Sequence, residues 1–347
     1  MSELEKINIY VPVEIGIQLH NDALLFEVYK KDKRTVNFNH FLSMLLCGYF
    51  DLYSQENKKT YDLLMEKMAQ TNLKEQEKAD LANRILKEII LPEIPRQKGA
   101  KPTRLSLKPT NETAPLIHAV ASGTAAGDDS ISRFFCRMLM AYCKKPFSER
   151  EQIVFHDAYQ FLQEACRKEQ EINFMTIWND KNVHHVIPYC LAIGEEEMFN
   201  YLLCEEINPL TGKPQPATYR LNRISRLTRG MGTKAVSDEV KKCCDRMKEF
   251  APQFVITDDE EICVKLSRKG ELQYNRIYHG RPKYSRIESE DGSSLYYFTC
   301  SKSQVLLYFR RFEPDTIEIV SPQALRDAMM TFHKKSYGVY SMSDCKA

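Results

Sequence analysis

The sequence lacks the features that would place it in a membrane or in an oxidising compartment. No apolar run approaches the ~20 residues that a membrane-spanning helix needs, and the N-terminus, MSELEKIN, lacks a signal-peptide core. Eleven cysteines are scattered without CxxC or Cys/His ligand spacing, which disfavours zinc sites and a disulfide framework. We therefore expect a soluble, cytoplasmic protein with reduced thiols, no metal and no membrane partner.

The sequence also lacks the short motifs of common enzymes. It has no GxSxG, no GxxxxGK[ST], no HExxH and no dinucleotide fingerprint. His184 and His185 could act as general acid and base, but no nucleophile or orienting carboxylate stands near them in the sequence. We predict no catalytic residue, no cofactor and no enzymatic activity.

Net charge is low, at +2 over 347 residues, but the charges are segregated. Basic tracts run from Arg96 to Lys108, from Lys213 to Lys234 and from Lys265 to Arg286, while acids cluster at 195–197, 205–206 and 258–261. Segregated charge can steer a polyanion despite a small total. The alternative is that basic and acidic segments form internal ion pairs.

The first 53 residues combine a short strand with two helices. Lys6 to Val11 alternates so that Ile7, Ile9 and Val11 face a core and Lys6, Asn8 and Tyr10 face outward. Pro12 suits the start of a helix, and a basic turn with Lys31, Lys33 and Arg34 leads to a second, strongly apolar helix that Thr35 or Asn37 can cap. We expect this second helix to be both core and dimer interface, because a lone strand needs a second copy to pair with.

This arrangement resembles the ribbon-helix-helix family over residues 5–53. The resemblance implies that two chains pair one strand each and that the outward residues enter a nucleic-acid groove. It also implies that the N-terminus of the second helix holds a phosphate. The predicted contacts are Lys6, Asn8, Tyr10, Lys31, Lys33, Arg34 and Asn37.

The rest of the chain reads as helices followed by strands. Helical periodicity covers 61–91, ended by Pro92 and Pro95, then 131–143 and 148–169, where Ser148 and Glu151 form a capping-box signature. Residues 102–129 read as a loop-rich connection. Strands are predicted at 173–178, 184–189, 198–204 and 218–227.

These strands carry a second resemblance, to the WYL domain, a small Sm-like β-barrel with a leading helix. The matching segments are Phe155 to Ala165, then His184-Val186-Pro188-Tyr189, Phe199 to Cys204 and Tyr219 to Ile224, with Tyr201-Leu202-Leu203 in place of the naming tripeptide. Phe298 to Ser301, Tyr308-Phe309 and Val320 to Pro322 resemble the extension that follows WYL domains. The resemblance implies a pocket for nucleic acid or a nucleotide, formed by His184, His185, Tyr189, Tyr201, Arg220, Arg223 and Arg226. Because Arg220 and Arg223 would face opposite sides of one strand, we expect only one of them to enter the pocket.

Together these resemblances give an α+β chain of four parts. We predict a ribbon-helix-helix domain at 1–55, a helical and loop-rich linker at 56–147, a WYL domain at 148–232 and an α/β C-terminal extension, a candidate dimerisation domain, at 236–347. The combination is similar to the WYL-domain accessory proteins of type VI-D CRISPR systems. That resemblance implies a homodimer that binds single-stranded RNA and stimulates an RNA-guided CRISPR effector nuclease. The alternative is a transcriptional repressor that binds duplex DNA and senses a nucleotide.

Overall fold

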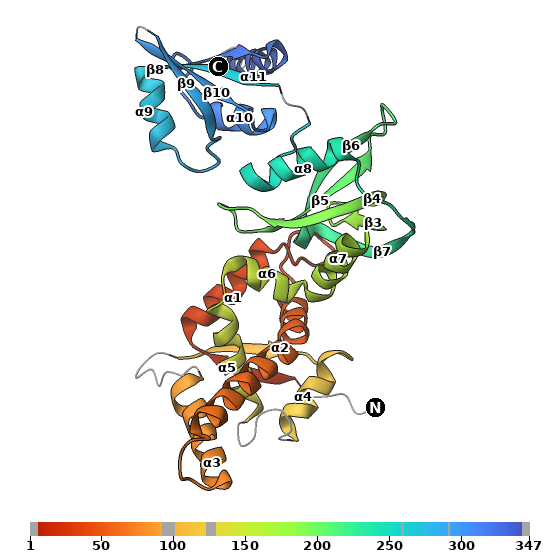
Figure 1. The fold of residues 1–347 in the computed structure, drawn as a ribbon, viewed down its shortest axis with the longest axis vertical. Coiled ribbons are helices and arrows are strands. Elements are labelled where there is room, and N and C mark those ends of the chain that lie inside the picture. Colours follow the sequence, from red (N-terminus) through yellow and green to blue (C-terminus); the bar gives the residue numbers. More distant parts are fainter. Residues whose placement is uncertain (1–5, 92–100, 123–129, 258–259, 291, 342–347) are drawn as a thin grey trace. The chain divides into compact units, whose positions relative to one another are not determined.

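The computed structural model describes residues 6–91, 101–122, 130–257, 260–290 and 292–341. The chain divides into two compact units, Met1–Gln160 and Phe161–Ala347, and the boundary falls within one helix, α7 (Figure 1). None of the described helices is both long enough and apolar enough to cross a bilayer. This division into two units does not test the predicted division into four parts, which stays a prediction.

The first unit is mostly helical, with one two-stranded sheet. Its elements are β1 (Ile7–Val11), α1 (Val13–Leu25), α2 (Phe38–Met68), α3 (Glu75–Ile85), a π-helical turn (Leu86–Ile90), β2 (Thr103–Leu107), α4 (Thr113–Ala121), α5 (Ile131–Cys143), α6 (Phe147–Val154) and the start of α7 (His156–Lys168). The predicted helix terminators Pro92 and Pro95, and the first two cations of the first basic tract, Arg96 and Lys98, lie outside the described residues.

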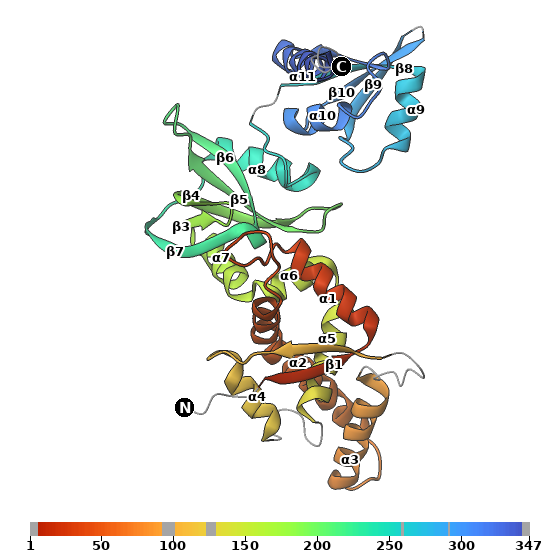
Figure 2. The same ribbon diagram turned by 180° about the vertical axis from the view of Figure 1, so that it is seen from behind.

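The predicted strand at the N-terminus exists, but it pairs within its own chain. β1 and β2 are antiparallel, with Ile7 opposite Leu107 and Val11 opposite Thr103, and Figure 2 shows them side by side. The premise that this strand has no partner in its own chain was wrong, since β2 lies in the stretch predicted as a loop. The predicted alternation is confirmed: Ile9 and Val11 are fully buried, whereas Tyr10 is 48% exposed.

Helix α5 lies against β1. The backbone N–H of Tyr10 donates to Ser132 Oγ at 3.3 Å, so this group of the strand is already bonded on the side away from β2. An unpaired strand edge is the usual site at which a further chain adds. In this protein α5 occupies part of that edge.

Helix α2 supplies the core of the first unit. Its apolar residues Phe41, Leu42, Leu45 and Leu46 are fully buried within one chain. The predicted role of this face as a dimer interface is therefore wrong, because α1, α5 and α6 pack around α2. Close approach requires a glycine at position 48, where a Cβ would lie 2.0 Å from the backbone oxygen of Ile153 in α6.

A buried ion pair links α1 to α5 and α6. Asp22 is 1% exposed and accepts from the Tyr142 hydroxyl at 2.9 Å and from Arg150 Nε and Nη2 at 2.8 and 3.0 Å. Arg150 Nη1 also donates to the Lys145 carbonyl. The carboxylate is thus satisfied on both oxygens, as a buried charge requires.

Two predictions about helix ends in this unit have opposite outcomes. The helix predicted at 131–143 is confirmed at both ends as α5. The capping box predicted from Ser148 and Glu151 is wrong, because α6 begins after Pro146 and both residues lie buried inside it. Proline at a helix start competes with a Ser cap two residues later, since it presets the backbone there.

The second unit contains two antiparallel sheets. The first comprises β3 (Gln170–Thr176), β4 (Asn179–Ile193), β5 (Asn200–Ile207), β6 (Pro214–Arg220) and β7 (Ile224–Thr233), in the order β6-β5-β4-β3-β7. The predicted α+β class is confirmed. The predicted closed barrel is not found in the described residues, since the outer strands β6 and β7 do not pair with each other.

Helix α8 (Asp238–Phe250) packs on this first sheet (Figure 1). Its buried residues Val240, Cys244 and Met247 form one apolar cluster with Ala192 and Leu203. The remaining elements are β8 (Ile262–Ser267), α9 (Arg268–Arg276), β9 (Tyr284–Glu290), β10 (Ser293–Phe298), α10 (Lys302–Phe309), β11 (Ile317–Ser321) and α11 (Gln323–Ser341). Their sheet has the order β11-β8-β10-β9, and its core is rich in aromatic rings from β10 and α10.

Candidate nucleic-acid interface

The outward face of the β1–β2 ribbon gathers polar and cationic side chains. Because side chains alternate along a strand, Asn8 and Tyr10 of β1 share this face with Arg104 and Ser106 of β2. Tyr10 lies directly opposite Arg104, and Arg104 Nε donates to Asn8 Oδ1 at 3.0 Å. The ribbon therefore presents a guanidinium, an amide and a phenol together.

Two lysines extend this face beyond the strand ends. Lys6 precedes β1, Lys108 follows β2, and both are exposed. No outward residue of β1 or β2 is acidic, and Asp or Glu is not found between Lys6 and Val11 or between Lys101 and Lys108. Asn39 near the start of α2 bonds both backbone groups of Lys108, which fixes the helix start beside this end of the ribbon. Guanidinium, ammonium and aromatic groups on one face suit a phosphate backbone and unstacked bases.

Arg104 was not singled out from the sequence as a contact. The strand Thr103-Arg104-Leu105-Ser106-Leu107 does alternate between polar and apolar residues, which is the period-two signal of a half-buried strand. The surrounding stretch 102–129 is rich in Thr, Ala, Gly and Pro and has no long periodic segment, which is why the sequence predicts a loop there.

The basic turn before α2 is a hairpin held together by its one acid. Asp32 accepts from the backbone N–H groups of Arg34 and Thr35 and from the Thr35 hydroxyl at 2.6 Å. These hydrogen bonds lower the pKa of Asp32 to about 2. Its carboxylate thus shapes the turn that carries Lys31, Lys33 and Arg34, with Lys33 at a positive φ of 54°. Lys31 and Arg34 are exposed.

Asn37 caps the next helix, as predicted. Its side chain accepts from the His40 backbone N–H at 3.3 Å. One of the N–H groups at the start of α2 is therefore already bonded, and the predicted phosphate site there stays a prediction.

In the second unit, His184 belongs to a hydrogen-bonded chain. Its Nδ1 lies 2.9 Å from the Tyr219 hydroxyl, which donates to Glu206 Oε2 at 2.5 Å. Since the tyrosine proton goes to the carboxylate, the proton between His184 and Tyr219 must come from His184 Nδ1. His184 also stacks on Phe174 with ring centroids 5.3 Å apart. Burial, reinforced by Glu206, raises the pKa of Tyr219. Glu206 of the neighbouring strand β5 therefore supplies a carboxylate that reaches His184 through Tyr219, although no carboxylate stands near His184 in the sequence.

The aromatic and arginine residues predicted for a pocket have local partners. Tyr189 donates to Asp245 of α8 at 2.6 Å, and Tyr201, 5% exposed, donates to Glu197 at 2.8 Å. The Arg220 guanidinium lies 3.3 Å from the centre of the Phe199 ring, and Arg220 Nε donates to Asn222. These contacts fix the residues within the sheet.

The expectation that Arg220 and Arg223 face opposite sides of one strand was wrong. Leu221–Arg223 is a 3-10 turn that separates β6 from β7, so strand alternation does not relate the two arginines. Arg226 follows in β7 with a positive φ of 50° and contacts Met175 Sδ. Of the seven predicted residues, only His185, bonded to Asn173 at 2.7 Å, lines the pocket of about 450 Å³ formed by β3, β4, β5 and β7, and a shared ligand site for the seven stays a prediction.

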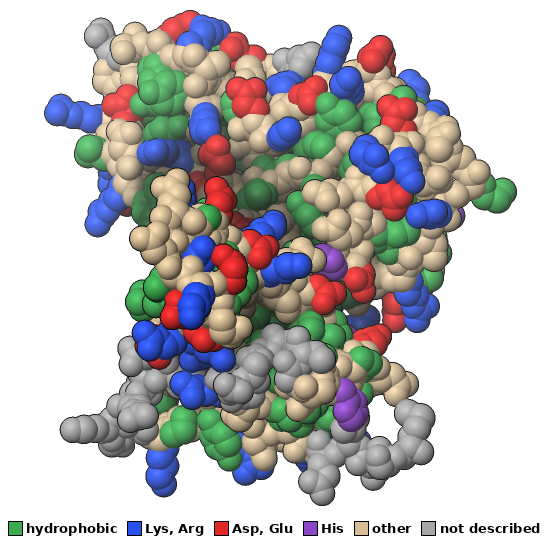
Figure 3. Space-filling view, turned by 60° about the horizontal axis from the view of Figure 1, so that its bottom comes forward, with side chains coloured by type: hydrophobic (Ala, Val, Ile, Leu, Met, Phe, Trp, Pro, Cys, Tyr) green, Lys and Arg blue, Asp and Glu red, His purple; other side chains and the backbone are tan. Residues whose placement is uncertain are grey.

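Three of the seven cations of the third basic tract form ion pairs. Lys283 pairs with Glu195 at 3.5 Å, Arg286 with Glu261 at 2.9 Å, and Lys269 with Glu313. The alternative of internal ion pairing thus holds for these three cations, and Asp258 and Asp259 of the acidic cluster lie outside the described residues. On the face shown in Figure 3, Lys and Arg side chains are interspersed with Asp and Glu rather than gathered into one patch.

No group of three or more His, Cys, Asp or Glu side chains among the described residues is arranged to hold a metal ion. Within the same residues no disulfide forms, and five of the cysteines are buried: Cys136, Cys204, Cys244, Cys263 and Cys300.

The whole chain shares its fold with a solved structure. That structure is the crystal structure of a CRISPR Cas-related protein. The match covers 98% of this chain and 95% of that one, with a TM-score of 0.65 and 18% sequence identity. Proteasome accessory factor B/C of Arthrobacter aurescens matches 65% of this chain and 35% of its own, at 16% identity and a TM-score of 0.25, which supports no argument. No family model and no curated protein matches the chain.

Proposed function

We propose that this chain is an accessory protein that binds single-stranded RNA and stimulates the RNA cleavage of an RNA-guided CRISPR effector nuclease of the type VI-D kind. The observation that carries the proposal is the outward face of the ribbon, where Tyr10 and Arg104 lie opposite each other between two exposed lysines. The neighbour's description as CRISPR Cas-related supports the biological setting. We propose no catalytic role for the chain itself.

The ribbon favours RNA over the alternative of a DNA-binding repressor. A ribbon built from two identical strands has two-fold symmetry and reads a palindromic site, whereas β1 and β2 differ in sequence and belong to one chain. An exposed tyrosine provides a platform for an unstacked base, and such a base is available only in a single strand. The homodimer remains part of the proposal, through a surface other than the buried face of α2.

Competition binding at a stated salt concentration tests the proposal. The triple variant Lys6→Ala, Tyr10→Ala, Arg104→Ala should bind unstructured RNA at least ~10-fold more weakly, because one stacked base alone contributes about 1–3 kcal/mol. Lys58→Ala with Lys59→Ala removes two exposed cations of α2 in the same unit and should leave the affinity unchanged. Tighter binding to duplex DNA than to RNA would support the repressor instead.

The accessory role needs a separate measurement. Cleavage of a reporter RNA by a type VI-D effector should be faster with this chain present and slower again with the triple variant. The chain alone should leave the reporter intact. RNA binding without stimulation would retain the ribbon assignment and contradict the accessory role.

A further inference from the structure

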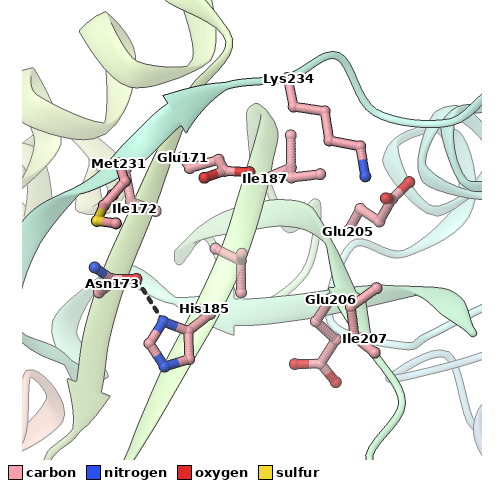
Figure 4. Close-up of a pocket in the computed structure, with 12 residues that line it drawn as sticks. Glu171, Ile172, Asn173, His185, Ile187, Glu205, Glu206, Ile207, Met231 and Lys234 are labelled. Atoms are coloured by element: carbon pink, nitrogen blue, oxygen red, sulfur yellow. Dashed lines mark hydrogen bonds between the residues drawn. The ribbon is translucent and has the colours of Figure 1, made fainter. Parts of the chain in front are cut away.

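A pocket of about 450 Å³ opens on one face of the five-stranded sheet (Figure 4). Its lining comes from β3, β4, β5, β7 and the residue after β7, Lys234. None of the arginines predicted for a nucleotide pocket lines it.

Glu205 is the unusual residue of this pocket. It is 1% exposed, and its Oε2 accepts from both the backbone N–H and the hydroxyl of Ser237, at 2.8 and 2.5 Å. Its other oxygen, Oε1, is buried with no hydrogen-bond partner. An unsatisfied buried carboxylate oxygen costs free energy that a ligand with an N–H donor would recover.

The charge of the pocket indicates the sign of that ligand. Two carboxylates, those of Glu171 and Glu205, line it against one cation, Lys234. The carboxylate of Glu206 points to the opposite face of β5, where it accepts from Tyr219. Figure 4 shows Lys234 extending toward Glu205, yet no ion pair joins the two in the described part of the chain. A phosphate would meet a net negative field here, whereas an ammonium group would meet a favourable one.

Apolar side chains in the pocket set a second requirement for the ligand. Ile187, Ile207 and Met231 border the carboxylates, so a ligand must carry hydrocarbon beside its charged group. We infer that this pocket binds an aliphatic organic amine of the polyamine class, with an ammonium group donating to Glu205 Oε1 and its methylene chain packed on these side chains. The inference concerns the second unit and does not depend on the ribbon as an RNA-binding surface.

Calorimetric titration of the full chain with spermidine tests this assignment. Spermidine should bind with one saturable site per chain, and Glu205→Gln should weaken binding at least ~10-fold, because the amide removes the charged acceptor. Glu239→Gln removes an exposed carboxylate of α8 and is the matched control, with affinity unchanged. Choline, whose quaternary nitrogen has no N–H to donate, should not bind.

The variant Lys234→Ala distinguishes an amine-binding pocket from an anion-binding pocket. Lys234 is a cation in the lining of the pocket and repels the ligand ammonium, so its removal should tighten spermidine binding, whereas removal of the only lysine of a phosphate pocket would weaken binding of a nucleotide. Any of four results would overturn the assignment. Two concern the variants: weaker spermidine binding in Lys234→Ala, or unchanged spermidine affinity in Glu205→Gln. The other two concern the ligand: choline that binds as tightly as spermidine, or saturable AMP binding that depends on Lys234. Thermal melting of both variants establishes that they are folded.

Discussion

At the scale of single residues, Asp22 shows how far a buried charge depends on its partners. Asp22→Asn keeps the side-chain size but removes the buried charge that pairs with the half-buried Arg150 guanidinium, so we expect a loss of about 3 kcal/mol in the free energy of unfolding. Urea denaturation measures the change. Glu318→Gln, which removes the exposed partner of the equally exposed Arg326, should cost less than ~1 kcal/mol. Equal effects would mean that Asp22 is solvated in solution.

Residue type alone could not separate paired from unpaired cations. Arg104 and Arg286 are both exposed arginines in predicted basic tracts, yet among the described residues Arg104 bonds the neutral Asn8, while Arg286 pairs with Glu261 and Glu288. The deciding acid is 25 residues away from Arg286 along the chain. Spacing in the sequence carries no information about such a contact.

At the scale of elements, α2 provides the sharpest test of what its apolar face does. Leu45 is fully buried within one chain, so Leu45→Asp should unfold the first unit, with a loss of at least ~3 kcal/mol from the lost burial and the unpaired charge. Leu63→Asp, at a 53% exposed leucine of the same helix, should leave folding intact. Circular dichroism and light scattering report the outcome. A folded Leu45→Asp protein with half the molar mass would restore the dimer interface predicted from the sequence.

Elements defined by local periodicity were predictable, whereas those defined by distant partners were not. The apolar alternation of Ile7, Ile9 and Val11 predicted β1, and the helical periodicity of 131–143 predicted α5. The partner of β1 lies about a hundred residues away along the chain. That partner strand has only five residues between two prolines, which is too short for its alternation to be recognised. For the same reason the candidate ribbon was half predicted, with Asn8 and Tyr10 but without Arg104.

At the scale of the whole molecule, pairing of charges limits how many cations can meet a polyanion. The net charge of +2 results from 49 basic and 47 acidic residues, and three of the seven cations of the third basic tract pair with acids of their own unit. Binding that relied on all three tracts would release many counterions. Binding through the ribbon releases few, because three cations, Lys6, Arg104 and Lys108, lie on its outward face or at its ends.

Salt dependence distinguishes these two cases. For single-stranded RNA each neutralised phosphate contributes about 0.7 to the slope of log affinity against log salt, so three ribbon cations predict a slope near −2. Arg104→Ala should reduce its magnitude by ~0.7 and lower the affinity at every salt concentration, whereas Arg286→Ala, which removes a cation already paired with Glu261, should leave the slope unchanged. Fluorescence anisotropy with a labelled unstructured RNA at several salt concentrations gives both slopes. A slope steeper than about −5 would show that the basic tracts outside the ribbon exchange their acidic partners for phosphates when RNA binds, and the ribbon would then be a minor part of the interface.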